Sequence, residues 1–281
     1  MRRNRVTEHN FPIQDQSQRC RWLLDFLIRE EPRYSGFRIP NDQTGQERLL
    51  HDLLAVRPAG DPGEEFLRVQ DAYLQNRFAE IGTPALEPVS QGPMICLRRG
   101  DIASFPCGAV VNSSNGDLTG CRSLRALSVD TALQTGAGVG LRLACRDAVE
   151  RHGGQVPPGE AVITEAYNLP CRYVIHTVAP AVRGGVPSEE EREDLARCYR
   201  ACLELAASYG LSSVAFPCLS TGHKRFPHVE AGEIAVSAVL EFLRSPGLLR
   251  QVVFNVYQEY DFEIYRELLL TPGLRARIAE D

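Results

Sequence analysis

The sequence predicts an α/β protein whose sheet is covered by helices on both faces and preceded by a helical extension. From residue 94 onward, short apolar runs rich in β-branched residues alternate with longer segments of helical periodicity, which is typical of strands joined by helices. Before residue 90, the apolar residues recur only at helical spacing. We therefore divide the chain into a helical extension (1–90), an α/β domain (91–272) and a tail (273–281).

The α/β domain contains short apolar runs of the length expected for buried strands. They lie at 94–98, 108–112, 160–164, 172–178, 212–218 and 251–257, with helical patterns at about 129–152, 189–209, 228–244 and 261–270. In such sheets, ligands bind outside the carboxyl ends of the strands. The loops that leave the strands are therefore where a site is expected.

The extension shows three amphipathic patterns, at 21–28, 47–56 and 64–78, with apolar residues at the spacing of one helix face. The segment 81–93 contains two glycines and three prolines. Because these residues interrupt regular structure, we expect a linker there.

Composition excludes several classes of protein. The net charge is −5, so the chain as a whole does not attract a phosphate backbone, and no nucleic-acid partner is expected. No run approaches the roughly 18 consecutive apolar residues of a membrane span. The nine cysteines are an odd number, and without a recognisable secretion signal they indicate reduced thiols and a cytoplasmic location.

Unusual residues follow four of the expected strands. Asp101 and Ile102 follow the first strand, Asn112 and Asn115 lie at the end of the second, and Tyr257 ends the last. A glycine-containing turn follows the fifth and leads into a helix; it consists of Ser220, Thr221, Gly222, His223, Lys224, Arg225 and Phe226.

Each of these features alone has an ordinary structural explanation, such as an Asx-turn or a helix cap. Together they favour a nucleotide diphosphate. Main-chain N–H groups at a helix start bind anions without a basic protein, and an aromatic face with a carboxylate acceptor suits adenine. The string Gly136-Ala-Gly138-Val-Gly140 lacks the spacing and the preceding strand of a dinucleotide-binding fingerprint.

The order of these motifs resembles the macrodomain family. The motifs are Gly100-Asp-Ile102, Val110-Val-Asn-Ser-Ser-Asn115, Ser220-Thr-Gly222 with Phe226-Pro227, and Phe254-Asn-Val-Tyr257. Further stretches at 64–74, 138–145, 166–170 and 173–178 resemble the zinc-dependent macrodomain hydrolases of bacteria and fungi, which remove ADP-ribose from proteins. The similarity runs from about residue 20 to residue 270. It implies a three-layer α/β/α fold with a central mixed sheet, and ADP-ribose or an ADP-ribosylated protein as the partner.

The resemblance also implies roles for the residues at the strand ends. Asp101 would accept a hydrogen bond from the adenine amine, the Ile102 N–H would bind a ring nitrogen, and Tyr257 would stack on the base. Asn112 and Asn115 would lie beside the distal ribose.

The turn 220–226 would then surround the diphosphate. His223 and Lys224 could add charged contacts to it; the alternative is a solvated turn. His176, on a strand pattern, is expected to be a hydrogen-bonded core histidine.

The sequence departs from the zinc branch at the metal ligands. In that branch a Cys is followed five residues later by His and two further on by Cys, whereas this chain has Cys121, Ala126 and Ser128. A methyl group cannot coordinate zinc, and a neutral hydroxyl is a poor ligand beside a thiolate. We therefore expect neither zinc nor any other cofactor.

Asp130 occupies the place of the family's aspartate, while Thr131 and Gln134 replace a neighbouring asparagine and histidine. With Asn115, Asp130 is the expected catalytic residue, since a carboxylate there could orient water and stabilise positive charge on the ribose. The alternative is that it only caps or decorates a helix.

Three hypotheses follow for the function. The first is an ADP-ribosyl hydrolase that acts on a protein or another acceptor without zinc. The second is a non-catalytic ADP-ribose reader. The third is a hydrolase of a small ADP-ribose derivative.

Overall fold

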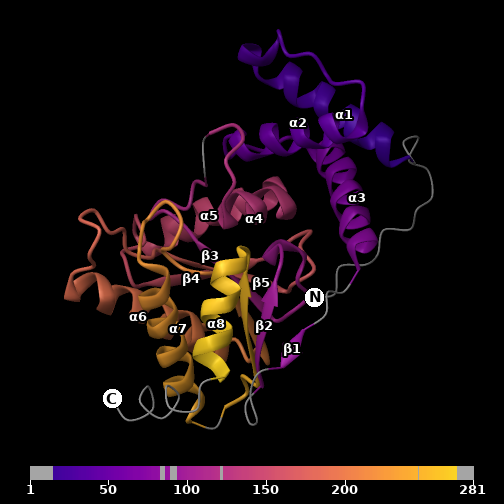
Figure 1. The fold of residues 1–281 in the computed structure, drawn as a ribbon. Coiled ribbons are helices and arrows are strands. Elements are labelled where there is room, and N and C mark those ends of the chain that lie inside the picture. Colours follow the sequence, from indigo (N-terminus) through magenta and orange to yellow (C-terminus); the bar gives the residue numbers. More distant parts are fainter. Residues whose placement is uncertain (1–14, 83–85, 89–93, 121–122, 246, 271–281) are drawn as a thin grey trace.

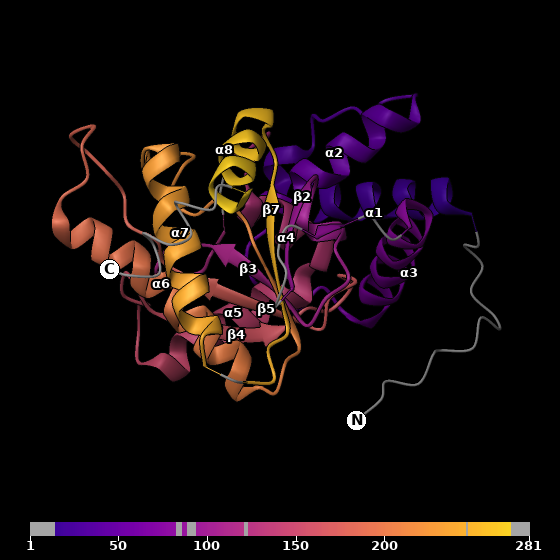
Figure 2. The same ribbon diagram turned by 60° about the horizontal axis from the view of Figure 1, so that its bottom comes forward.

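The computed structural model describes residues 15–82, 86–88, 94–120, 123–245 and 247–270. Its central sheet lies between α4 and α5 on one face and α6, α7 and α8 on the other (Figures 1 and 2). The expected tail lies outside the described residues. The elements are α1 (Gln16–Glu30), η1 (Pro32–Tyr34), α2 (Gln43–Val56), α3 (Glu64–Ile81), β1 (Glu87–Pro88), β2 (Met94–Arg99), η2 (Ile102–Ser104), β3 (Ala109–Ser113), α4 (Val129–Ala137), α5 (Val139–His152), β4 (Ala161–Glu165), β5 (Tyr173–Thr177), α6 (Glu189–Ser208), β6 (Ser213–Phe216), α7 (His228–Leu243), β7 (Gln251–Val256) and α8 (Glu259–Leu270).

The sheet is mixed, with the strand order β1-β2-β7-β6-β3-β5-β4. The five central strands are parallel, and β1 and β4 are antiparallel to their neighbours at the two ends of the sheet. The parallel strands place their carboxyl ends at one edge, which we call the carboxyl edge. Every loop singled out in the sequence leaves one of these strands at that edge.

The strands have two buried faces. Val110 and Val174 pack with the α4–α5 side, and Val111 and Ile175 pack with the α6–α8 side. Successive side chains of a strand point to opposite faces, so these continuous apolar runs fill both layers of the core. The expected three-layer α/β/α fold is confirmed.

The extension, α1–α3, has a hydrophobic core of its own that includes Phe66 and also contains Val139 of α5. Polar contacts join it to the domain. Gln70 Oε1 accepts a hydrogen bond from Val139 N at 3.0 Å, and Asn168 Nδ2 donates to Asp71 Oδ1 at 2.7 Å. The extension therefore packs directly against α5, on the α4–α5 side of the sheet (Figure 1).

The helix expected over 129–152 is two helices, separated at Gly138. Gly138 has φ +84°, and a Cβ at this position would lie 2.6 Å from Gln70 Cδ. A Cβ at Gly136 would lie 2.9 Å from the Leu169 side chain, and one at Gly140 would lie 2.5 Å from the Tyr167 ring. These three glycines are needed for close packing between helices and loops. This packing, and not dinucleotide binding, explains the glycine string 136–140.

The segment 81–93, expected to be a linker, also contributes β1, which pairs antiparallel with β2. Sequence periodicity could not reveal a strand of two residues. No helix in the described part of the chain is long and apolar enough to cross a membrane.

Candidate functional site

Four loops meet the carboxyl edge in the order of their strands. The loop with Asp101 and Ile102 follows β2, and Tyr257 follows the neighbouring strand β7. The turn 220–226 follows β6, and Asn112 lies at the end of β3. Four loops far apart in the sequence therefore lie side by side along the carboxyl edge. A row of this length suits an elongated ligand such as a nucleotide diphosphate.

At the β2 end of the row, a 3-10 turn presents a carboxylate and main-chain amides. Asp101 caps η2, because its Oδ1 accepts from Ala103 N at 2.9 Å. The Ile102 side chain is buried in the core, whereas Tyr257 is 72% exposed. An aromatic ring that is open to solvent beside this turn can stack on a flat ligand.

Arg98 and Asn255, to which no role was assigned from the sequence, hold this turn in place. Buried Arg98 donates to Asn255 Oδ1, to the carbonyl of Asp101 at 3.1 Å and to Ser104 Oγ at 3.2 Å. Asn255 Nδ2 donates to the Gly100 carbonyl at 2.8 Å. Burial lowers the pKa of Arg98. The sequence did contain a hint of this role, because Arg98 and Asn255 are polar residues within otherwise apolar strands.

The turn after β6 is tightly folded. Ser220 and Arg225 have φ of +65° and +60°. Phe226 N donates to the Ser220 carbonyl at 3.0 Å, Arg225 N donates to the Gly222 carbonyl at 3.0 Å, and Ser220 Oγ donates to the Pro180 carbonyl at 2.7 Å. The ring of Phe226 is buried beneath the turn, which leads directly into α7.

Within this turn, Thr221 is half-buried and bonds the Cys218 carbonyl, while Gly222, His223 and Arg225 are exposed. Lys224 differs. Its Nζ donates to the carbonyls of Ala179 at 2.6 Å and Ser114 at 3.1 Å, and burial lowers its pKa. The ammonium therefore ties the turn to the ends of β5 and β3.

A buried polar cluster lies at the β3 end of the row. Asn112 Nδ2 lies 2.8 Å from Asp130 Oδ1, near the start of α4, and 2.7 Å from Ser114 Oγ. Burial raises the pKa of Asp130, and the Asn112 hydrogen bond and the Arg142 charge partly oppose this rise. Two buried acceptors, Asn112 Oδ1 and Gln134 Oε1, have no donor among the described residues.

His176 lies behind this cluster. Its Nε2 is 2.9 Å from Thr164 Oγ1 and its Nδ1 is 3.2 Å from Asn112 Nδ2. Complete burial lowers its pKa to about 3, so the ring is neutral at physiological pH. The expectation of a hydrogen-bonded core histidine is confirmed.

Asn115 lies at the rim of the cluster, two residues beyond the end of β3. Its side chain is exposed, and its carbonyl accepts from Leu118 N at 3.1 Å. Buried Asn112 therefore contacts Asp130, and exposed Asn115 is left accessible to a ligand.

Two of the three residues at the places of the family's zinc ligands lack the donors that zinc prefers. Ala126 has no donor atom, and Ser128 Oγ caps α4 by accepting from Thr131 N at 3.1 Å. Cys121 lies outside the described residues. In the segments that the structure describes, no three His, Cys, Asp or Glu side chains gather around one point.

Comparison with known proteins agrees with this geometry. A family model described as "Macro domain" matches residues 111–235. A protein-ADP-ribose hydrolase from Treponema medium is 40% identical over 260 residues, which cover 90% of this chain and 99% of that protein. The chain belongs to the macro domain family.

Two further relatives show how far the similarity extends. An O-acetyl-ADP-ribose deacetylase from an Enterobacter species is 39% identical over 182 residues, 65% of this chain and 97% of that protein. A solved mutant macrodomain from Oceanobacillus iheyensis with ADPR has a TM-score of 0.59 and 32% identity, over 70% of this chain and 99% of that one. The Treponema protein thus aligns with a longer part of this chain than either of these two relatives does.

Proposed function

We propose that this macrodomain binds ADP-ribose along the carboxyl edge and hydrolyses the bond between ADP-ribose and a protein, without zinc. The observation that carries the proposal is the row of four loops, which ends at a buried carboxylate. The names of its relatives, a protein-ADP-ribose hydrolase and a macrodomain with bound ADPR, support the same ligand.

In this proposal the base lies at the β2 end of the row. Asp101 accepts a hydrogen bond from the adenine amine, the Ile102 N–H binds a ring nitrogen, and Tyr257 stacks on the ring. Arg98 and Asn255 act as positioning residues because they hold the main chain of this turn.

The diphosphate lies in the turn 220–226, where main-chain amides near the start of α7 supply the donors. The side chains of Ser220 and Lys224 hold the turn in shape through carbonyl contacts. Exposed His223 and Arg225 can approach the phosphates. The fold of the turn thus replaces a basic surface as the means of binding an anion.

Hydrolysis takes place at the β3 end, where the distal ribose lies beside Asn112 and Asn115. Asp130 orients a water molecule and accepts its proton as the water oxygen bonds to the anomeric carbon. The bond from that carbon to the acceptor breaks, and the acceptor leaves with the electron pair and takes up a proton. Positive charge develops on the ribose, and the Asp130 carboxylate stabilises it.

A protein acceptor is favoured over a small one by the extent of the two similarities. The relative named for protein substrates aligns over 260 residues, which include most of the extension. The relative named for O-acetyl-ADP-ribose aligns over only 182 residues, close to the length of the macrodomain core. The relative that shares the extension is therefore the one named for protein substrates.

An assay of Asp130→Asn on a mono-ADP-ribosylated protein tests the proposal. We expect kcat to fall by about 100-fold or more, while calorimetry gives an ADP-ribose affinity within about threefold of wild type. Asp147→Asn, an exposed carboxylate on α5, is the matched control and keeps full activity. Wild type that binds ADP-ribose without turnover would instead establish a reader.

The absence of zinc chemistry has its own test. Turnover measured after treatment with a strong chelator should equal that of untreated protein. Loss of turnover that returns on addition of zinc would refute this part of the proposal.

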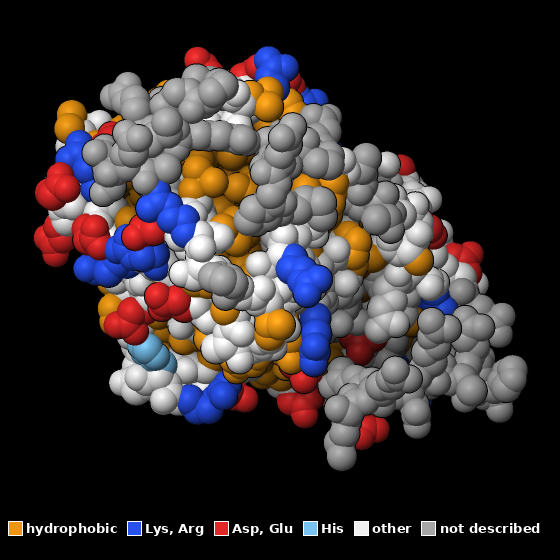
Figure 3. Space-filling model, turned by 90° about the horizontal axis from the view of Figure 1, so that it is seen from below, with side chains coloured by type: hydrophobic (Ala, Val, Ile, Leu, Met, Phe, Trp, Pro, Cys, Tyr) orange, Lys and Arg blue, Asp and Glu red, His pale blue; other side chains and the backbone are white. Residues whose placement is uncertain are grey.

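We also propose a cytoplasmic protein that has no nucleic-acid partner. The odd number of cysteines supports the location, and the net charge of −5 supports the absence of a nucleic-acid partner. On the face in Figure 3, Lys and Arg side chains lie among Asp and Glu side chains and form no continuous basic surface among the described residues.

A further inference from the structure

A cavity of about 920 Å³ lies where the extension meets the macrodomain. We propose that it receives the polypeptide segment that carries the ADP-ribose, so that the extension forms part of the acceptor site. This inference rests on the hydrolase activity proposed above. It assigns a substrate-binding role to a part of the chain outside the four loops.

The cavity has walls from both parts of the chain. The extension contributes Tyr34, Val56 and Ala59, and the macrodomain contributes Leu118 and Val149, among others. Half of the lining side chains are apolar, and the rest are polar or charged, including Asp117, Arg142 and Glu150. The volume lies within the range of about 300–1,000 Å³ that is usual for ligand pockets, far more than an acyl group of a few atoms would fill.

The cavity lies close to the catalytic end of the carboxyl edge. Its wall includes Asp117, Leu118 and Thr119, which follow Asn115 closely in the chain. Leu118 N donates to the Asn115 carbonyl at 3.1 Å. Arg142 also lines the cavity, and its charge acts on Asp130. The loop at the distal ribose therefore becomes the cavity wall within a few residues.

The orientation of ADP-ribose along the carboxyl edge indicates where the acceptor lies. With adenine at β2 and the distal ribose at β3, the acceptor bonded to that ribose lies beyond β3. The strands beyond β3 are β5 and β4, and α5, which packs against β4, forms part of the cavity wall. An acceptor bound elsewhere would have to turn back over the nucleotide.

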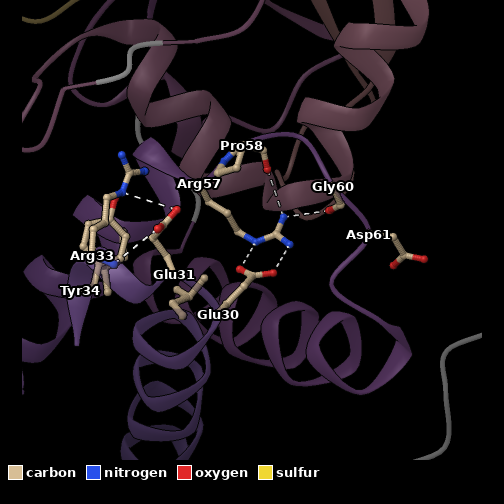
Figure 4. Close-up of a pocket in the computed structure, with 10 residues that line it drawn as sticks. Glu30, Glu31, Arg33, Tyr34, Arg57, Pro58, Gly60 and Asp61 are labelled. Atoms are coloured by element: carbon tan, nitrogen blue, oxygen red, sulfur yellow. Dashed lines mark hydrogen bonds and ion pairs between the residues drawn. The ribbon is translucent and has the colours of Figure 1, made fainter.

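The extension's part of the wall is held rigidly. Arg57 is paired with Glu30 through two contacts, of 2.7 and 2.6 Å, and its Nη1 donates to the Gly60 carbonyl at 2.9 Å. These contacts lie in a smaller neighbouring pocket, shown in Figure 4, which shares Tyr34 and Pro58 with the cavity wall. Arg142 donates to the carbonyls of Ala55 and Arg57 from the macrodomain side. A wall fixed before binding reduces the entropy lost when a substrate is ordered.

The segment that connects the cavity to α4 exposes large apolar side chains. Leu124 lines the cavity and is 42% exposed, and Leu127 is 89% exposed. Exposed apolar side chains beside a cavity with a partly apolar wall indicate a surface for protein contact. A protein substrate would cover them when its modified residue enters the site.

Filling the cavity tests the inference. Ala59 is exposed on the loop after α2 and Ser123 is exposed on the opposite wall, so Ala59→Trp and Ser123→Trp occupy the cavity without replacing a core side chain. Leu248→Trp, at a residue 62% exposed just before β7, is the control at the other edge of the sheet. Circular dichroism establishes that each variant is folded.

We expect both cavity variants to lower kcat/KM for an ADP-ribosylated protein by about tenfold or more, equivalent to about 1.4 kcal/mol. Hydrolysis of O-acetyl-ADP-ribose and the Kd of free ADP-ribose should stay within about twofold, because neither needs the cavity. Unchanged turnover of the protein substrate, or an equal loss with both substrates, would overturn the inference.

A binding measurement separates this inference from the proposed activity. In an Asp130→Asn background, which removes turnover, the ADP-ribosylated protein should bind more tightly than free ADP-ribose, and Ala59→Trp should abolish the difference. Equal affinity for the two ligands before that change contradicts the acceptor site, whether or not wild type is a hydrolase.

Discussion

Asp130 is a mostly buried carboxyl group, held 2.8 Å from the amide of Asn112 and influenced by the charge of Arg142. The sequence identified Asp130 through a family resemblance. It did not show that Asn112 is buried beneath the site as its hydrogen-bond partner, because strand and helix come together only in the folded sheet. The same limit explains why no positioning role could be assigned to Arg98 or to Asn255 from the sequence.

The pH profile of turnover follows from this environment. Burial raises the pKa of Asp130, and the carboxylate is the active form, so activity is present above that pKa and is lost as pH falls through it. We expect the acid limb of kcat/KM to lie above the value of about 3.9 for a free aspartate. Asn112→Ala should move the limb to still higher pH, because it removes a hydrogen bond that lowers the pKa.

Initial rates measured from acid to neutral pH, with circular dichroism to confirm folding at each pH, provide the check. A limb at or below the free aspartate value, or one that Asn112→Ala leaves in place, argues against Asp130 as the group that loses activity in acid.

Lys224 shows how a residue type can be assigned correctly to a loop while its contacts stay hidden. Its place in the turn suggested a charge aimed at a diphosphate. In the structure the ammonium contacts two main-chain carbonyls, of Ala179 and Ser114. Side-chain direction depends on neighbours from other strands, and no local pattern encodes it.

At the scale of elements, periodicity located the six apolar strands and most helix boundaries, because buried runs and helical spacing are local properties of the chain. It failed where tertiary contacts decide. The pattern at 129–152 is continuous, but Gly138 leaves helical geometry where Gln70 packs against it. The short strand β1 exists through its pairing with β2.

Substitution of Gly138 measures the cost of this junction. Gly138→Ala places a methyl group at φ +84° and 2.6 Å from Gln70 Cδ, whereas Gly153→Ala, at φ +89°, meets no atom within 4 Å. Both variants carry backbone strain. We expect the free energy of unfolding to fall further in Gly138→Ala, by about 1 kcal/mol or more.

Urea denaturation of the two variants gives the comparison. An equal loss of stability would show that Gln70 yields without cost and that the junction is not closely packed.

The whole molecule consists of two parts with separate hydrophobic cores, joined through α5 and a small set of polar contacts. Asn168 is central to this junction, since its side chain bonds Asp71, Gln75 and the Ala137 carbonyl. Sequence patterns predicted the helices of the extension, but its place on the macrodomain, and the cavity between them, depend on contacts between residues far apart in the chain.

Trp22, the only tryptophan, reports on the extension, because it stacks with Phe26 in α1. In wild type we expect its fluorescence and the far-UV circular dichroism to change at the same urea concentration. In Asn168→Ala the fluorescence change should come first, since Asp71 and Gln75 of the extension lose their bonds to the macrodomain. Ser208→Ala, at an exposed residue of α6, is the control, and its fluorescence and circular-dichroism curves should coincide.

The close approach of Gln70 to Gly138 has a consequence for how such sequences diverge. A residue with a side chain at position 138 would require a shorter one at position 70, and a shorter residue at 70 would leave the Val139 N–H without its acceptor. The two positions are therefore under joint selection. Among homologues that keep the extension they should covary, and in those that lack it position 138 is released from this constraint.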